Sequence, residues 1–167
     1  MTDEIDVAEL LPKMVAELLE HCKLSGMENP VMVGIHTGGA WVARELHALL
    51  GWTTELGELN IDFYRDDFAQ IGMHAQASPS RIPFSVEDRD IVLVDDVLFT
   101  GRTTRAALNE IFDYGRPRSV TLVVLIDRGG RELPIQADIV GKHVTVRATE
   151  QVKLTGPKPL RLTVAAT

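Results

Sequence analysis

Apolar residues recur along the chain with the spacings of helices that alternate with strands. In residues 7–22 they stand three and four positions apart, which predicts an amphipathic helix with Asp6 as its N-cap. The same reasoning predicts helices over 40–50 and 103–114, and Gly115 follows the latter as a stop signal. Three helices are therefore expected.

Short apolar runs between these helices predict strands. They lie at residues 31–35, 53–59 with part of 60–64, 91–94 and 120–126. The last run is almost entirely apolar, as expected of a parallel strand covered on both faces. From Asp127 onward the chain reads as strands and turns. The alternation predicts one α/β domain over residues 1–167, with a mainly parallel twisted sheet flanked by helices.

Residues 65–90 show no clean period and contain Gly72, Pro79 and Pro83. Loops of this length inside compact domains are usually lids, binding loops or disordered segments. We therefore expect a lid or binding loop here, with room for a short hairpin.

The charge of the chain narrows the choice of ligands. Its 167 residues are 45% hydrophobic and 25% charged, the composition of a globular protein, and the net charge of −7 argues against nonspecific binding of nucleic acid. Residues 1–90 hold 16 acidic and 6 basic side chains, whereas residues 91–167 hold 8 acidic and 11 basic ones. A site for an anionic ligand should therefore draw mainly on the second half.

The location follows from three further features. Cys22 is the single cysteine, so no intrachain disulfide can form, and no apolar run approaches the length of a membrane span. The N-terminal residues are acidic and do not resemble a signal peptide. We expect a cytoplasmic protein without membrane contact.

The chemistry concentrates in residues 91–105, with the sequence IVLVDDVLFTGRTTR. Asp95 and Asp96 follow a buried strand, at the end where open α/β sheets bind their ligands. Thr100–Thr104 then opens a helix, whose first N–H groups and hydroxyls suit a terminal phosphate. Because carboxylates repel phosphate, they should meet hydroxyl groups or a metal. A sugar phosphate fits both halves of this segment.

Other interpretations of the segment are weaker. An Asp-Asp turn followed by a Thr N-cap needs no ligand, but the phosphate cradle at this offset disfavours that reading. The chain has neither a G-x-x-x-x-G-K-[ST] nor a G-x-G-x-x-G motif. A phosphoacceptor receiver domain would need more chain after Asp95 than is present.

Asp95–Arg105 resembles the phosphoribosyl pyrophosphate (PRPP) signature of type I phosphoribosyltransferases. The segments LGEL (56–59), YRDD (64–67), DYGRP (113–117) and DRGGRELPIQAD (127–138), with Gly141-Lys142, resemble the PyrR group within that family. This group regulates pyrimidine biosynthesis and also acts as a uracil phosphoribosyltransferase. The resemblance covers roughly residues 31–145.

The resemblance implies a reaction of uracil with PRPP and Mg²⁺ that yields UMP and pyrophosphate. Asp95 and Asp96 would be the catalytic acids that hold the ribose hydroxyls, and the metal would be carried by PRPP without a fixed protein site. The residues implied in phosphate and PRPP binding are Val97, Leu98, Phe99, Thr100, Gly101, Arg102, Thr103 and Thr104. The resemblance also implies a pyrophosphate loop at His36, Thr37, Gly38 and Gly39. It implies a mobile hood loop over the site with Arg65, His74 and Arg81, and recognition of the uracil base by Ile126, Asp127 and Arg128.

The pyrophosphate loop departs from the family pattern. Well-studied members carry Lys-Thr-Arg-Gly where this chain has His36-Thr37-Gly38-Gly39. A fixed cation is lost at Gly38, and His36 is mostly neutral near pH 7. This predicts weak turnover, unless backbone N–H groups and Mg²⁺ suffice.

The positions that bind RNA in relatives have also changed. They match Pro12, Lys13, Ala16, His21, Gly130 and Gln136, and only Lys13, His21 and the nearby Lys142 keep the relevant character. The first helix is acidic and would repel phosphates. RNA is therefore the less favoured partner, while UMP and UTP are expected ligands and a homodimer or homotetramer the expected assembly.

Two hypotheses stand at this point, with an inert α/β domain as the third. One is a uracil phosphoribosyltransferase; the other is a non-catalytic nucleotide-binding regulator that acts through RNA or a protein partner. The five histidines are scattered without metal-ligand spacing, so only His36 is a candidate among them for a role at the reaction site.

Overall fold

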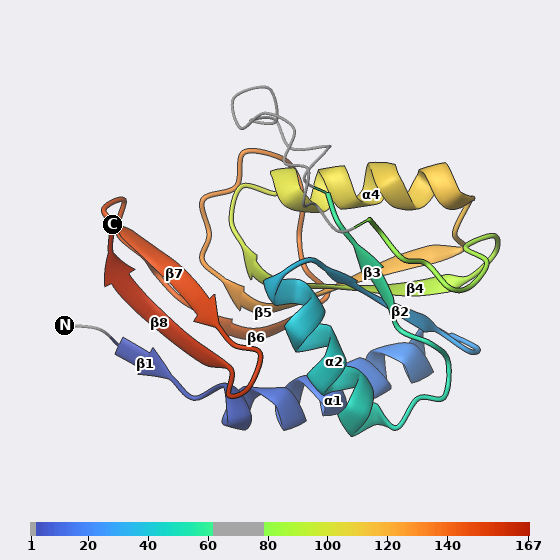
Figure 1. Ribbon diagram of the computed structural model, residues 1–167, viewed down its shortest axis with the longest axis horizontal. Helices are drawn as coiled ribbons and strands as arrows, with labels where there is room; N and C mark the ends of the chain where they lie inside the picture. Colours follow the sequence, from blue (N-terminus) through green and yellow to red (C-terminus); the bar gives the residue numbers. More distant parts are fainter. Residues whose placement is uncertain (1–2, 62–78) are drawn as a thin grey trace.

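The computed structural model describes residues 3–61 and 79–167. A five-stranded parallel sheet forms its centre, in the order β3-β2-β4-β5-β6 (Figure 1). The strands are β2 (Val31–Ile35), β3 (Gly57–Leu59), β4 (Asp90–Leu98), β5 (Ser119–Asp127) and β6 (Ile139–His143). The expected α/β class with a parallel sheet is confirmed.

Helices cover both faces of this sheet. The helices α1 (Val7–Leu24) and α2 (Gly38–Leu50) pack on one face, and α4 (Arg102–Tyr114) packs on the other (Figure 1). Asp6 caps α1 as expected, since its Oδ1 accepts a hydrogen bond of 3.0 Å from the N–H of Ala8. The helix α4 ends at Tyr114, and Gly115 is its C-cap, as the sequence predicted.

The two covered faces explain why β4 is apolar at successive positions. Side chains alternate between the faces of a strand. Val92 and Val94 therefore lie in the core with α1 and α2, whereas Ile91 and Leu93 lie in the core with α4. All four are fully buried. Both layers of helix thus depend on the same strand.

The connections around β2 and β4 leave the sheet in opposite directions. After β2, the chain passes through α2 on one face and reaches β3, which lies beside β2. After β4, it passes through α4 on the other face and reaches β5, on the far side of β4. In open α/β sheets, the crevice at such a reversal, at the carboxyl ends of the strands, is where ligands bind.

A second, smaller sheet joins the two ends of the chain. Strands β1 (Asp3–Ile5), β8 (Arg161–Ala166) and β7 (Glu150–Thr155) are antiparallel in the order β1-β8-β7. The turn between β7 and β8 packs against α2, where a Cβ on Gly156 would lie 3.2 Å from the Trp41 ring. Sequence analysis missed β1, which has only three residues.

Two predicted boundaries are wrong. β4 does not end at Val94 but continues through Leu98, because Asp95, Val97 and Leu98 stay paired with β5. The predicted loop over 95–102 is accordingly reduced to residues 99–101. β3 is also shorter than predicted, since only Gly57–Leu59 pair with β2.

Most of the segment expected to form the hood, residues 62–78, lies outside the described part of the chain. In that described part, no helix has the length and apolar character needed to cross a membrane. The cytoplasmic location stays a prediction.

An ion pair between the buried Asp90 and the half-exposed Arg118 stabilises the amino ends of the strands. Asp90 at the start of β4 is 3% exposed and accepts hydrogen bonds from the Arg118 guanidinium and, at 2.6 Å, from Ser119 Oγ. The hydrogen bond from Arg118 lowers the pKa of Asp90, and the contribution of Ser119 in the same direction helps to outweigh the opposing effect of burial.

Because the pKa of Asp90 is lowered by folding, its contribution to stability is complete above the pKa of the unfolded carboxyl, about 3.9. That contribution is lost as the pH falls through the pKa of the folded state. Arg118→Met should therefore destabilise the protein at pH 7, because it leaves the buried Asp90 carboxylate without its charged partner. Urea unfolding measures the free energy of unfolding of both proteins. The difference between parent and variant should be smaller at pH 3 than at pH 7, because Asp90 begins to take up a proton.

Arg116→Met is the matched control, because Arg116 is exposed on the same connection and its side chain has no ion pair within the described residues. An Arg118→Met variant as stable as this control at pH 7 would contradict the assigned role of the ion pair.

Candidate functional site

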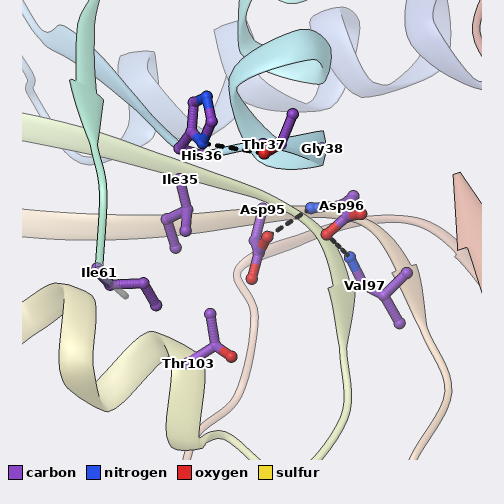
Figure 2. A pocket seen from close by; sticks show the side chains of 9 residues that line it. All are labelled: Ile35, His36, Thr37, Gly38, Ile61, Asp95, Asp96, Val97 and Thr103. Atoms are coloured by element: carbon purple, nitrogen blue, oxygen red, sulfur yellow. Dashed lines mark hydrogen bonds between the residues drawn. The ribbon is translucent and has the colours of Figure 1, made fainter. Parts of the chain in front are cut away.

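A pocket of about 450 Å³ opens at the carboxyl ends of β2 and β4, where the connections reverse. Figure 2 shows the side chains around it. Those that sequence analysis predicted are His36, Thr37 and Gly38 from the first turn of α2, Asp95, Asp96 and Val97 from β4, and Thr103 from α4. Ile35 and Ile61 complete the lining and were not predicted, although both lie at or near the ends of predicted strands.

The two carboxylates are fixed by the strand on which they stand. Asp95 is 5% exposed, and its Oδ1 accepts a hydrogen bond of 2.8 Å from the N–H of Asp96. Asp96 Oδ1 accepts one of 2.9 Å from the N–H of Val97. Figure 2 shows Asp95 extending toward the side of Thr103, whereas Asp96 lies next to the first turn of α2. Neighbouring residues of one strand thus present acids to two parts of the pocket.

The first turn of α2 approaches β4 very closely. A Cβ on Gly39 would lie 2.6 Å from the carbonyl oxygen of Val94 and 2.9 Å from Cα of Asp95. One on Gly34 would lie 2.7 Å from Cα of Ala40. Neither position can accept a side chain without a shift of backbone, so Gly39, predicted in the pyrophosphate loop, lies behind the pocket and sets the spacing between helix and strand.

His36 and Thr37 form the entrance to α2. Thr37 is the N-cap, but its hydroxyl makes no cap hydrogen bond and instead lies 2.9 Å from Nδ1 of His36. The peptide bond between these two residues is cis. Both side chains line the pocket, as the family resemblance implied for a loop that binds pyrophosphate.

The loop before α4 packs closely against the segment at 133–135. Gly101 is the N-cap with φ 93°, and a Cβ there would lie 3.0 Å from Cγ1 of Ile135. Thr100 Oγ1 accepts a hydrogen bond of 3.2 Å from the N–H of Arg102. Thr104 is buried, and its hydroxyl has no hydrogen-bond partner within the described residues.

The other residues assigned to PRPP by resemblance are placed differently. Leu98 is 2% exposed and packs in the core with α4, so its side chain does not reach the pocket. Phe99 is 45% exposed, and Arg102 is exposed, with its Nε 3.6 Å from Oε1 of Glu132. Neither lines the pocket, and of the Thr100–Thr104 segment only Thr103 does.

Arg131 connects the loop before α4 with the end of β5, a role that the sequence did not reveal. Its guanidinium donates to the carbonyl oxygens of Phe99 and Ile135 at 2.8 Å and to Oδ2 of Asp127 at 2.5 Å. Burial opposes ionisation of Asp127, but the hydrogen bonds from Arg131 and from the N–H of Gly129 outweigh it and lower the pKa of that carboxyl. Asp127 is thus an ionised anchor.

The three residues predicted to bind the uracil base differ in which of their groups are accessible to a ligand. The Ile126 side chain is fully buried in the core, so only its backbone is available there. Asp127 is engaged with Arg131. The Arg128 guanidinium carbon lies 3.9 Å from the centroid of the Phe99 ring, in a cation–π contact.

The hood residues are described only in part. Arg65 and His74 lie outside the described residues. Arg81 pairs through its backbone with Glu58, and its Nη2 lies 3.2 Å from Oε2 of Glu55. It does not line the pocket. Its hood role stays a prediction.

A second hollow, of about 470 Å³, lies between α1 and β6. Lys13, Gln136 and Lys142, which match the RNA-binding positions of relatives or lie near them, line it together with the acids Glu17, Asp127 and Asp138. The surface therefore carries both signs of charge and has no run of cations along it.

Comparison with known proteins places this chain in a family. The phosphoribosyl transferase domain family matches residues 1–156. "Bifunctional protein PyrR" of Nitrosococcus oceani is 65% identical over 138 residues, which cover 81% of this chain and 78% of that protein. The protein of the same name from Pseudomonas aeruginosa strain LESB58 is 56% identical over 155 residues, covering 93% of this chain and 91% of the relative.

Solved structures agree on the fold. A hypoxanthine phosphoribosyl transferase of Trypanosoma cruzi has a TM-score of 0.62 at 19% identity, with coverage of 86% of this chain and 76% of that one. A hypoxanthine-guanine-xanthine phosphoribosyltransferase has a TM-score of 0.59 at 19% identity, covering 83% and 75%. With the parallel sheet, the acidic pair and the sequence matches together, the chain belongs to the PyrR family of phosphoribosyltransferases.

Proposed function

We propose that this protein transfers the ribose 5-phosphate of PRPP to uracil, yielding UMP and pyrophosphate, and that the same site senses pyrimidine nucleotides. The observation that carries the proposal is the pocket between α2 and α4, in which two carboxylates face the first turns of two helices. Its volume of about 450 Å³ is within the range of small-molecule sites.

The proposed reaction exchanges two bonds at C1′ of the ribose. The bond from C1′ to the pyrophosphate oxygen breaks, the bond from C1′ to N1 of uracil forms, and the N1 proton leaves. Positive charge develops on the ribose as pyrophosphate departs. Positioning of both substrates and exclusion of water then supply most of the catalysis.

Asp95 and Asp96 suit the ribose hydroxyls, because ionised carboxylates accept hydrogen bonds and repel phosphate. Thr100–Thr104 suit the 5′-phosphate, as N–H groups at a helix N-terminus bind anions.

The His36–Gly39 turn suits the pyrophosphate, with Mg²⁺ carried by PRPP. No group of three or more His, Cys, Asp and Glu side chains in residues 3–61 and 79–167 could hold a metal ion by itself. The acidic pair beside the α2 turn fits a cation whose remaining ligands come from the substrate. Mg²⁺ offsets the charge of pyrophosphate when it is bound.

The base would be recognised near Ile126–Arg128, with backbone groups of Ile126 and the stacked Arg128 available for it. Nucleotide sensing is the second function, favoured by the relatives that are named bifunctional. UMP and UTP are its proposed ligands, RNA its less favoured partner, and a homodimer or homotetramer the proposed assembly.

Conversion of radiolabelled uracil to UMP, with PRPP and Mg²⁺, tests the enzymatic proposal directly. We expect turnover with uracil and none with hypoxanthine, offered at the same concentration as a control for base identity. Absence of turnover together with retained binding of UMP would instead identify a non-catalytic regulator.

The ribose assignment is tested by Asp95→Asn and Asp96→Asn. Each removes a charged acceptor, so we expect PRPP to bind about 10- to 100-fold more weakly with the melting temperature little changed. Titration calorimetry measures the binding. Asp88→Asn, at the opposite edge of the sheet and at a positive φ that Asn tolerates, is the control. Unchanged PRPP affinity in both site variants would refute the assignment.

The phosphate assignment is tested by Thr100→Val combined with Thr104→Val. The volume is kept while two hydroxyls are lost, so UMP should bind about tenfold more weakly or worse. Thr163→Val on β8 is the matched control. UMP affinity equal to that of the control would place the phosphate elsewhere.

A further inference from the structure

The chain that leaves β3 is held by side chains from distant parts of the sequence. The N–H of Asn60 donates a hydrogen bond of 2.8 Å to Oγ of Ser80, which lies 20 residues further on. Ser80 Oγ in turn donates to Oε1 of Glu110, on α4. The two hydrogen bonds form a tether, from Asn60 through Ser80 to Glu110, that joins the end of β3 to α4.

The backbone pairing beside β3 does not extend to this point. Glu58 and Arg81 exchange two backbone hydrogen bonds, of 2.8 and 2.7 Å, as an antiparallel pair. The next hydrogen-bonded pair of such a ladder would join Asn60 to Pro79, which has no N–H to donate. The hydroxyl of Ser80 receives the Asn60 N–H instead.

The tethered segment belongs to the wall of the pocket. Ile61 follows Asn60 directly, is 2% exposed and lines the pocket (Figure 2). On the other side of Asn60, the carbonyl oxygen of Leu59 accepts a hydrogen bond of 2.7 Å from the N–H of His36, which also lines the pocket. Segment 59–61 is therefore held at Leu59 by the loop before α2 and at Asn60 by the tether to α4.

Burial of the Glu110 carboxyl is costly. Glu110 is 7% exposed, and its Oε2 has no hydrogen-bond partner within the described residues. Burial raises the pKa of this carboxyl, an effect that the hydrogen bond from Ser80 opposes and the charge of Asp113 reinforces. An apolar residue of similar volume would avoid the cost, so stability alone does not account for an acid at this place.

We propose that Glu110 and Ser80 are positioning residues for the PRPP pocket, which hold segment 59–61 so that Ile61 keeps its place in the wall. Neither Glu110 nor Ser80 is among the described residues that line the pocket, so their effect on PRPP passes through the tether. The inference rests on the proposed function for its effect on PRPP, although its structural part does not.

Loss of the tether should act on binding and not on the chemical step. Without it, segment 59–61 occupies its position in the wall for only part of the time, and the affinity for a ligand falls by that fraction. Because the loss applies to substrate and transition state alike, KM for PRPP should rise while kcat changes little.

Ser80→Ala removes the middle of the tether. KM for PRPP should rise about 3- to 10-fold, with kcat within about twofold of the parent, in the conversion of uracil to UMP well below the melting temperature. Titration calorimetry should show the same rise in Kd. A KM for PRPP equal to that of the parent would overturn the proposal.

Ser119→Ala is the matched control for this variant. Ser119 Oγ also donates to a buried carboxylate, that of Asp90, but at the amino ends of the strands. Its loss should lower the melting temperature without changing KM for PRPP. An equal rise of KM in Ser119→Ala and Ser80→Ala would show a general effect of lost stability and overturn the proposal.

Two variants of Glu110 separate the hydrogen bond from packing. Glu110→Gln keeps an acceptor for Ser80, so KM should stay within about twofold of the parent. Glu110→Met fills the space without an acceptor, so KM should rise as in Ser80→Ala, and the double variant should add little. A lower melting temperature of Glu110→Met with unchanged KM would indicate a structural role alone and overturn the proposal.

Hydrogen exchange of the Ser80→Ala variant tests the structural part without a ligand. Exchange at the N–H groups of Asn60 and His36 should become at least about threefold faster relative to exchange at Val92, inside β4. If the parent binds no PRPP, the proposed function fails, and faster exchange at both groups still supports the tether. If the parent forms UMP and exchange at both groups is unchanged, the tether fails and the proposed function stands.

Discussion

The close contact between the first turn of α2 and strand β4 is the constraint on which the site depends. Gly34 and Gly39 allow the helix to lie against backbone atoms of the strand, so that no side chain separates the two elements. The end of β4 then projects past the helix, and both carboxylates open into the same pocket. A bulkier residue at either position would widen the gap and separate the acids from the loop at 36–38.

Near α4, hydrogen bonds from one side chain hold the loop before the helix in place, whereas α2 is held by close packing of backbone. Arg131 holds the carbonyl of Phe99, the carbonyl of Ile135 and the carboxylate of Asp127 at once. The loop before α4 is thereby tied to the segment that follows β5. The loop before α4 is thus held in place by neighbours that do not line the pocket, as preorganised sites require.

The apolar periodicity predicted the helices and the parallel sheet because burial on two faces leaves a strong pattern, as in Ile91–Val94. It misplaced the end of β4, since Asp95 and Asp96 read as a loop although their backbone pairs with β5. The acidic pair and the Thr-Gly-Arg-Thr-Thr segment were recognisable because their chemistry is local. The role of Arg131 was not, because two of its three acceptors are carbonyl oxygens, whose positions depend on the folded loops. Likewise, the tether through Ser80 joins segments that are distant in the sequence.

The pairing of β1 with β8 has a consequence for the order of events during synthesis. Residues 3–5 leave the ribosome long before their partners at 162–164 are synthesised. The strands of the parallel sheet, by contrast, are all complete by residue 143. The nascent chain can therefore assemble its nucleotide-binding half while β1 is still without a partner. Closure of the small sheet must wait until residues 161–166 have been synthesised.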